Sequence, residues 1–205
     1  MFLFEELADL LSGFSGVFES RSEGFDFQGP VNAPVSHGLA VFVKKDHKIL
    51  GSTGEVVSYA GEVVDKNIIA QIVNCVSSQG RQLAVINFHG LATPGNKLDT
   101  PERVNQSEKL VRIWENLPDV PKILCGDFNL MPYSRSINIL SALGRDLIRE
   151  YKVQNTRNEI SWKRFGNMQK FADFCFVSKD IEVKDFQVPY NEVSDHLPLI
   201  LEFDL

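Results

Sequence analysis

The sequence KILCGDFN, residues 122–129, joins a short apolar run to a polar loop, and it decides how the rest of the chain is interpreted. Residues 122–125 predict a strand, because apolar and β-branched side chains lead directly into a glycine. The two polar residues of the loop, Asp127 and Asn129, then stand at a strand end, where a rigid scaffold best presents catalytic groups. We interpret this stretch as the centre of a functional site on a sheet.

Further strands and helices surround this stretch on both sides. Apolar or alternating runs predict strands at 39–43, 68–76, 83–88, 172–178, 183–188 and 199–203, with a hairpin turn at 77–80. Helical spacing predicts helices at 2–14, at 101–117 and after the capping residue Ser134. Residues 20–36, rich in glycine and proline, predict a loop that could act as a lid. Because helices and strands do not alternate strictly, we expect an α/β fold of two packed sheets flanked by helices.

The composition predicts a compact chain with a sizeable core. Its 205 residues are 43% hydrophobic and no block lacks apolar residues, so we expect a single domain over residues 1–205. The net charge of -6 argues against a broad, non-specific grip on nucleic acid. A bound metal ion can still supply local positive charge for phosphate chemistry inside a ring of carboxylates.

The start of the chain and its cysteines bear on location. Glu5 and Glu6 interrupt the apolar residues that follow Met1, which argues against a signal peptide or a membrane segment. The three cysteines form no C-x-x-C pattern and lie in apolar stretches, so we interpret them as reduced thiols. We therefore expect a cytoplasmic protein without a membrane segment, and no obligate protein partner is evident.

Three short polar clusters lie at the ends of predicted strands. They are Asn87-Phe88-His89-Gly90, Gly126-Asp127-Phe128-Asn129 and Ser194-Asp195-His196. Asp173 differs from them, because it lies inside the apolar run 171–177, where an unpaired carboxylate is costly to bury. A histidine is the obvious partner, since a buried carboxylate that accepts its ring N–H fixes the tautomer and favours the imidazolium.

At these residues the chain resembles the endonuclease/exonuclease/phosphatase superfamily. The matches are Gly126-Asp127-Phe128-Asn129 for the family's G-D-F-N, Ser194-Asp195-His196 for its S-D-H, Asp173 for the Asp of its D-Y-[IV]-F strand, and His89 after its middle strand. The resemblance covers nearly the whole chain. It implies a deoxyribonuclease I-like four-layer sandwich of two mixed sheets flanked by helices. It also implies a metal-dependent hydrolase that cleaves a phosphoester, of nucleic acid or of a small phosphorylated molecule, by in-line water attack.

The resemblance further implies a role for each matched residue. His196 would move a proton at the phosphate, and Asp173 would hold it. Asp127 and Asn129 would position the attacking water and the phosphoryl oxygens, and the proton of that water could go to either Asp127 or His196. His89 would donate a hydrogen bond to the oxygen whose charge grows in the transition state.

The implied cofactor is a divalent metal ion, faced by Asp195. Mg²⁺ is expected, with Mn²⁺ as the alternative, because both suit a site of carboxylates and substrate phosphate. The chain departs from the family at its start, where the strand with the site Asn and the strand with the metal-ligand Glu have no counterpart. We therefore expect an N-terminally truncated form of the fold. Glu5 and Glu6, on a terminal helix, are poor substitutes for that ligand.

Other interpretations stay open. The chain could be a non-catalytic or impaired remnant of the same fold that acts as a binding module. G-D-F-N could be a simple Asx turn, Asp173 an acceptor for backbone amides, and His89 an exposed loop residue. Lys163, Arg164 and Lys170 could bind substrate phosphate or form a solvated basic face. A serine or cysteine nucleophile has little support, because the chain contains no G-x-S-x-G elbow.

Overall fold

The computed structural model describes residues 3–23, 25–26, 29–30, 36–59, 67–165 and 169–205. The elements in chain order are α1 (Leu3–Leu10), β1 (Phe14–Glu23), β2 (Phe25–Asp26), β3 (Gly29–Pro30), β4 (Ser36–Lys44), β5 (Lys48–Tyr59), β6 (Asn67–Val76), β7 (Gln82–His89), α2 (Pro101–Asn116), β8 (Lys122–Asp127), α3 (Arg135–Ser141), β9 (Arg145–Asp146), α4 (Leu147–Glu150), α5 (Glu159–Phe165), β10 (Asp173–Val177), β11 (Glu182–Gln187) and β12 (Ile200–Asp204). Every strand predicted from the sequence has a counterpart here, within a few residues at each end.

Six strands form one mixed sheet in the order β5-β6-β7-β8-β10-β9. Only β7 and β8 run parallel, and the other neighbouring pairs in this sheet are antiparallel. The predicted β6–β7 hairpin is confirmed: Gly80 N donates to Ser77 O at 2.9 Å, and Ser77 N donates to Arg81 O at 2.8 Å. Helix α2 makes the crossover between the parallel strands, so β7 and β8 end at the same edge of the sheet.

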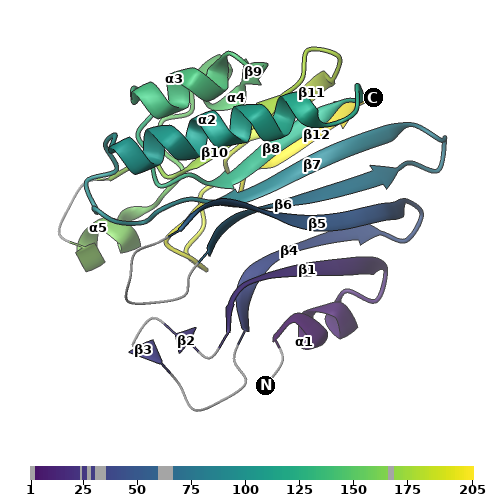
Figure 1. Ribbon diagram of the computed structural model, residues 1–205, viewed down its shortest axis with the longest axis horizontal. Coiled ribbons are helices and arrows are strands. Elements are labelled where there is room, and N and C mark those ends of the chain that lie inside the picture. The colour runs from purple at the N-terminus through teal and green to yellow at the C-terminus, as the bar shows by residue number, and fades with distance from the viewer. Residues whose placement is uncertain (1–2, 24, 27–28, 31–35, 60–66, 166–168) are drawn as a thin grey trace.

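Helices α2, α3 and α4 gather at one side of the molecule in Figure 1 and share the main core with the sheet. Thr100 caps α2 by accepting from Arg103 N at 3.2 Å, and Ser134 caps α3, as predicted. The core cluster joins these helices to alternate residues of β7, β8 and β10 and includes Ile86, Phe88, Leu110, Leu124, Leu140, Phe174 and Phe176. None of the described helices is long and apolar enough to span a membrane.

The opposite face of the six-stranded sheet is covered by two short antiparallel pairs, β1–β4 and β11–β12. Gln71 and Asn87, neighbours in register on β6 and β7, donate to Val17 O (3.1 Å) and Ala40 O (3.3 Å) of the first pair. The second pair lies over β7, β8 and β10, around a cavity of about 440 Å³ that is lined mainly by apolar residues. These two pairs make up the second β layer.

Helix α1 lies on the outer side of β1–β4, as Figure 1 shows near the N-terminus. The Phe4 ring lies 5.7 Å from that of Phe18 and 5.4 Å from that of Phe42. Gly16 makes this approach feasible, because a Cβ there would lie 2.6 Å from the Phe42 ring. Helices, six-stranded sheet, two-stranded pairs and α1 therefore form the expected four-layer α/β sandwich.

The structure differs from the sequence prediction mainly near the N-terminus and at β5, and the short elements β9, α4 and α5 were not predicted either. The helix expected at 2–14 ends at Leu10, and β1 starts at Phe14 and extends to Glu23, into the segment expected to be a loop. The rest of the lid hypothesis falls partly on residues 24, 27–28 and 31–35, which lie outside the described residues. Strand β5, which the sequence analysis missed, is formed by long pairing with β6 despite its glycines.

Candidate active site

The register of three strands brings His89, Asp127 and Asp173 side by side. His89 ends β7 opposite Asp127, which ends β8, and Asp127 in turn is opposite Asp173, which begins β10. Paired residues of neighbouring strands point to the same face of a sheet. His89 Nε2 accordingly lies 3.7 Å from Asp127 Oδ2. These three predicted site residues are therefore placed by the sheet itself.

The Gly126-Asp127-Phe128-Asn129 turn is fixed on both its polar and its apolar side. Asn129 N donates to Asp127 Oδ1 at 2.8 Å, and Phe128 N donates to Ala172 O at 2.8 Å. The Phe128 ring, 1% exposed, packs against Phe88 and two phenylalanines of β10. Gly126 is required here, because its φ is 137° and a Cβ would lie 2.0 Å from Phe88 O. The turn is thus an Asx turn and part of the site at once.

The Ser194-Asp195-His196 loop is held by a polar segment, residues 156–158. Leu197 N donates to Thr156 O at 2.9 Å, and Asn158 N donates to Asp195 O at 3.1 Å. The Asn158 side chain donates to Ser194 O at 2.7 Å. An isolated β-bridge pairs Arg157 with His196, and Arg157 Nη2 lies 2.9 Å from Asp195 Oδ2. Hydrogen bonds and one ion pair therefore fix the position of this loop, whereas strand pairing fixes the position of Asp127.

His196 and Asp173 form the pair predicted from the sequence. His196 Nδ1 lies 2.9 Å from Asp173 Oδ2 and 3.1 Å from Oδ1. The other ring nitrogen, Nε2, faces Asp127, with Oδ2 at 3.9 Å. Thr156 Oγ1 accepts from Asp173 N at 3.1 Å and so ties the start of β10 to the 156–158 segment. The arrangement can orient an imidazole and stabilise its protonated form.

Burial and charge shift the pKa values of these groups in different directions. Burial alone would lower the pKa of His196, but the hydrogen bond to Asp173 and the charges of Asp173 and Asp127 raise it. Burial raises the pKa of Asp173, against the hydrogen bond from His196. The pKa of His89 is lowered by burial, although the charge of Asp127 pulls it upward. The two histidines thus differ: His196 favours the cation and His89 the neutral ring.

A loop after β7 adds a cation to the site. Lys97 is 6% exposed, and its Nζ donates to Asn129 Oδ1. Burial lowers the pKa of Lys97 to about 8, while the charge of Asp127 acts in the opposite direction. Arg103, 1% exposed, holds the loop by donating to backbone oxygens, among them Pro94 O and Leu98 O, each at 2.6 Å.

Asp127, Asp173 and His196 could together hold a metal ion. Each offers one ligand atom, and these atoms lie within 4.8 Å of one another. Two carboxylates and one imidazole fit a divalent cation such as Mn²⁺ or Mg²⁺, although the nitrogen is less typical of Mg²⁺. Asp195, the residue expected to face the metal, is outside this group and pairs with Arg157. Burial acts to raise the pKa of Asp195, but the hydrogen bond from Arg157 and the charges of His196 and Arg157 lower it overall.

The three basic residues expected to bind substrate lie around α5 and the start of β10. Lys163 is 77% exposed in its side chain and pairs with Glu159 at 3.0 Å. Lys170 is exposed, and its backbone oxygen accepts from Thr156 N at 2.8 Å. The side chain of Arg164 lies outside the part of the chain that the structure describes.

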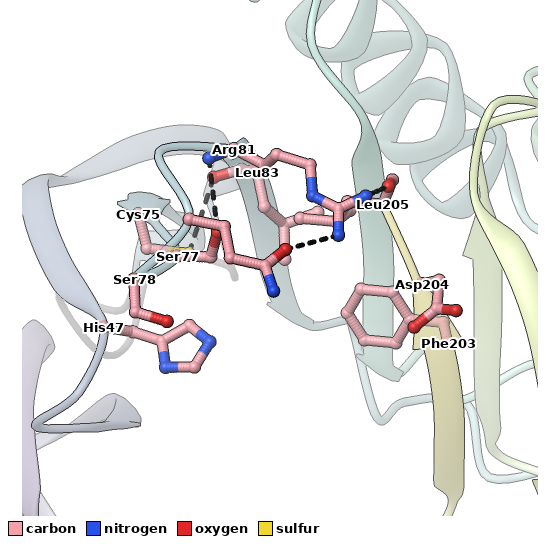
Figure 2. A pocket seen from close by; sticks show the side chains of 10 residues that line it. His47, Cys75, Ser77, Ser78, Arg81, Leu83, Phe203, Asp204 and Leu205 are labelled. Carbon is pink, nitrogen blue, oxygen red and sulfur yellow. Dashed lines mark hydrogen bonds between the residues drawn. The ribbon is translucent and has the colours of Figure 1, made fainter.

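A second cavity lies at the opposite end of β7 from the site. It measures about 420 Å³ and is formed by the β6–β7 turn and the C-terminal residues. Figure 2 shows Arg81 within it, with its guanidinium donating to Leu205 O. The residues of the candidate site do not line this cavity, so it is separate from them.

The sequence analysis missed the residues that support the site from outside the four motifs. They are Lys97, Arg103, Thr156, Arg157 and Asn158. The sequence contained only an indirect indication of these residues, because some polar or charged side chains fall at positions that the predicted elements would bury. Arg103, on the apolar side of α2, is the clearest case, because an arginine there must find acceptors.

Solved structures share this fold at low sequence identity. The human Nocturnin catalytic domain with bound sulfate anion has a TM-score of 0.72 and 22% identity, over 98% of this chain and 76% of that chain. The complex of D. rerio TDP2 with a single-strand DNA product has a TM-score of 0.71 and 15% identity, over 100% and 83%. A mannosyl-6-phosphatase from Bacteroides thetaiotaomicron has a TM-score of 0.68 and 18% identity, over 98% and 81%.

Sequence comparison identifies the family directly. A comparison with curated proteins finds no match. The family described as the Endonuclease/Exonuclease/phosphatase family, in contrast, matches residues 9–196, a span that contains all four motifs. The match agrees with the resemblance, with the four-layer fold and with the convergence of the motif residues at one sheet edge. This chain therefore belongs to the endonuclease/exonuclease/phosphatase family, whose members are phosphoesterases.

Proposed function

We propose that this chain is a divalent-metal-dependent phosphodiesterase that hydrolyses its substrate by in-line attack of water. The observation that carries the proposal is the His196–Asp173 pair at 2.9 Å, with the other imidazole nitrogen facing Asp127. A buried carboxylate that orients an imidazole beside a second carboxylate is suited to moving a proton at a reacting water. His47 also pairs with a carboxylate, that of Asp46 at 2.7 Å, but both of those side chains are exposed, whereas the His196–Asp173 pair is partly buried.

The proposed roles follow from where each side chain lies. His196 Nε2 exchanges a proton with the water or the leaving oxygen, and Asp173 holds the ring by accepting from Nδ1. Asp127 and Asn129, joined by the 2.8 Å bond from Asn129 N to Asp127 Oδ1, position the water and a phosphoryl oxygen. His89 donates to the oxygen on which charge develops.

Metal binding is part of the proposal. Asp127 and Asp173 would supply oxygen ligands, with Asp195 as a further ligand through the oxygen that does not accept from Arg157. A bound Mg²⁺ or Mn²⁺ would polarise the phosphoryl oxygens and offset their negative charge. If His196 itself joined the ion, its nitrogen would favour Mn²⁺ over Mg²⁺.

The net charge of the chain and the ligands of the similar structures bear on which class of substrate is proposed. The similar structures include a domain with a bound sulfate anion, a complex with a single-strand DNA product and a mannosyl-6-phosphatase, so both small molecules and nucleic acid are candidate substrates. The net charge of -6 favours a small phosphodiester or a short nucleic-acid end over a long duplex. Lys163, Arg164 and Lys170 would bind a substrate phosphate. The three cysteines are free thiols, which suits a reducing compartment such as the cytoplasm.

The test is release of p-nitrophenol from bis(p-nitrophenyl) phosphate by the purified chain, with Mg²⁺ or Mn²⁺ and with EDTA. We expect turnover that requires the metal and falls at least about 100-fold in His196→Ala. His47→Ala is the matched control, because His47 is an exposed histidine whose side chain pairs with its neighbour Asp46, away from the candidate site. If the wild-type chain is folded but shows no turnover, the binding-module interpretation is favoured. The dissociation constant for inorganic phosphate would then test whether the chain binds phosphate.

A further inference from the structure

Lys97 lies in an unusual position for a lysine. It sits in the loop between β7 and α2 with a φ of 57°, a backbone conformation that non-glycine residues rarely adopt. Its backbone oxygen accepts from Met131 N at 3.0 Å, so the loop is tied to the chain just beyond the Gly126-Asp127-Phe128-Asn129 turn. A strained backbone held by several hydrogen bonds indicates that the position of this side chain is specified by the fold.

The loop is held from the other side by Arg103. Its guanidinium donates to the backbone oxygens of Leu91 (3.2 Å), Ala92 (3.3 Å), Pro94 (2.6 Å) and Leu98 (2.6 Å). One buried arginine therefore satisfies four carbonyl groups of the loop, which would otherwise be costly to bury. Hydrogen bonds therefore hold the loop from both sides of Lys97, through Arg103 and through Met131 N.

The contact of Lys97 determines which way the Asn129 carboxamide faces. A lysine ammonium can only donate, so the Asn129 atom beside Nζ must be the oxygen. Gly90 O can only accept, and it lies 3.2 Å from Asn129 Nδ2, so the atom on that side must be the nitrogen. Two independent neighbours therefore require the same amide orientation, and the assignment does not depend on a choice between the two flips.

We infer that Lys97 is a positioning residue for the reaction, which holds the Asn129 carboxamide so that its second N–H faces the phosphoryl group. One of the two Nδ2 hydrogens donates to Gly90 O at 3.2 Å. The second is the donor that this inference assigns to the substrate. Without the ammonium, the carboxamide is free to turn and to present its oxygen, which repels a phosphoryl oxygen. This inference rests on the proposed phosphodiesterase function and adds a residue that none of the four motifs contains.

A double-mutant cycle on bis(p-nitrophenyl) phosphate turnover tests this inference. Lys97→Met keeps the length of the side chain and removes the charge, and we expect kcat to fall about 100-fold with KM within about twofold. Asn129→Ala should lower kcat by a similar factor. The double variant should match Asn129→Ala, because Lys97 has nothing left to orient. If Lys97→Met lowers kcat by the same factor in both backgrounds, Lys97 acts independently of Asn129 and the inference is wrong.

Lys152→Met is the matched control, because Lys152 is another lysine with positive φ, 51°, and it is exposed. It should leave kcat within about twofold of the wild type. If the wild type shows metal-dependent turnover and Lys97→Met has the same kcat, the inference is wrong but the proposed function stands. A folded wild type without turnover would overturn the proposed function.

A measurement without catalysis tests the orientation itself. In ¹⁵N–¹H spectra, the side-chain amide of Asn129 is assigned by its loss in Asn129→Asp. The wild-type Nδ2 hydrogen that is bonded to Gly90 O should exchange slowly with solvent, and in Lys97→Met it should exchange at least about tenfold faster. Equal exchange in both proteins would show that Lys97 does not fix the amide, whether or not the chain is an active enzyme.

Discussion

The site has two halves that are built in different ways. The sheet half, Asp127, Asn129 and Asp173, is placed by strand register and by the Phe128 ring in the core. The loop half, Asp195 and His196, is placed by hydrogen bonds and an ion pair to residues 156–158.

The two halves meet in the His196–Asp173 pair, which joins the loop to the first residue of β10. Core packing is worth several kcal/mol per large side chain and depends little on pH, whereas hydrogen bonds and ion pairs are weaker and respond to protonation. Substitution of Phe128, the apolar anchor of the sheet half, should therefore act mainly on stability, and substitutions that loosen the loop half should also lower activity. The pair that joins them should show the largest effect on catalysis.

Asp173→Asn should have the largest effect, because it leaves the position filled and removes the charge that orients His196. We expect kcat on bis(p-nitrophenyl) phosphate to fall about 10²–10⁴-fold, since an amide there can hold the imidazole in the wrong tautomer. Asp180→Asn, at an exposed aspartate near the end of the same strand, is the control and should stay within about twofold. If kcat fell by less than about tenfold in Asp173→Asn, the His196–Asp173 pair would have no essential role in the mechanism.

Phe128→Ala tests the sheet half through stability. Phe128 is 1% exposed, and its ring contacts Phe88, Phe174 and Phe176 at centroid distances of 5.3 to 5.8 Å. Its truncation should lower the free energy of unfolding in urea by about 3–5 kcal/mol. Tyr133→Ala, at an aromatic residue that is 68% exposed, should change it by about 0.5 kcal/mol or less. A loss near 1 kcal/mol at Phe128 would mean that the turn is not anchored through the core.

The same division explains how much could be predicted from the sequence. The strands that carry Asp127, Asp173 and His89 were predicted because their apolar runs are local signals, and the motifs made the four-layer fold recognisable. Strands β1 and β5 were missed, since glycines weaken their local pattern and their pairing with β4 and β6 supplies the stabilisation.

The supporting residues could not be predicted, because their contacts span long stretches of the chain. Lys97 and Asn129 are 32 positions apart, and Arg157 and Asp195 are 38 positions apart. The residues next to Lys97 and Arg157 in the sequence do not indicate that these side chains are buried. Contacts with distant parts of the chain determine which charged side chains point inward, so this part of the site could be identified only from the three-dimensional structure.

Arg157→Met tests the loop half. The Arg157 side chain is 6% exposed and that of Asp195 is 24% exposed, so the ion pair is intermediate between buried and surface pairs. We expect the free energy of unfolding to fall by about 1–3 kcal/mol and kcat by about tenfold, as the loop with His196 loosens. Arg145→Met is the control, because it removes a more exposed pair with Glu150 and should cost about 1 kcal/mol or less without loss of activity. Full activity in Arg157→Met would show that the loop does not need this ion pair.

The smallest predicted effect is a difference between the two halves in how the free energy of unfolding depends on pH. The pKa of His196 is raised in the folded chain, so its pair with Asp173 stabilises fully below the unfolded pKa of about 6.5. That contribution is lost as the pH rises through the raised folded pKa. In EDTA, the stability difference between wild type and His196→Gln should therefore shrink by about 1 kcal/mol between about pH 5.5 and about pH 8.5. Phe128→Ala should cost the same at both pH values, because no titrating group contributes to its packing. If the His196→Gln difference were constant and the Phe128→Ala difference changed, the assignment of charge to the loop half and packing to the sheet half would be reversed.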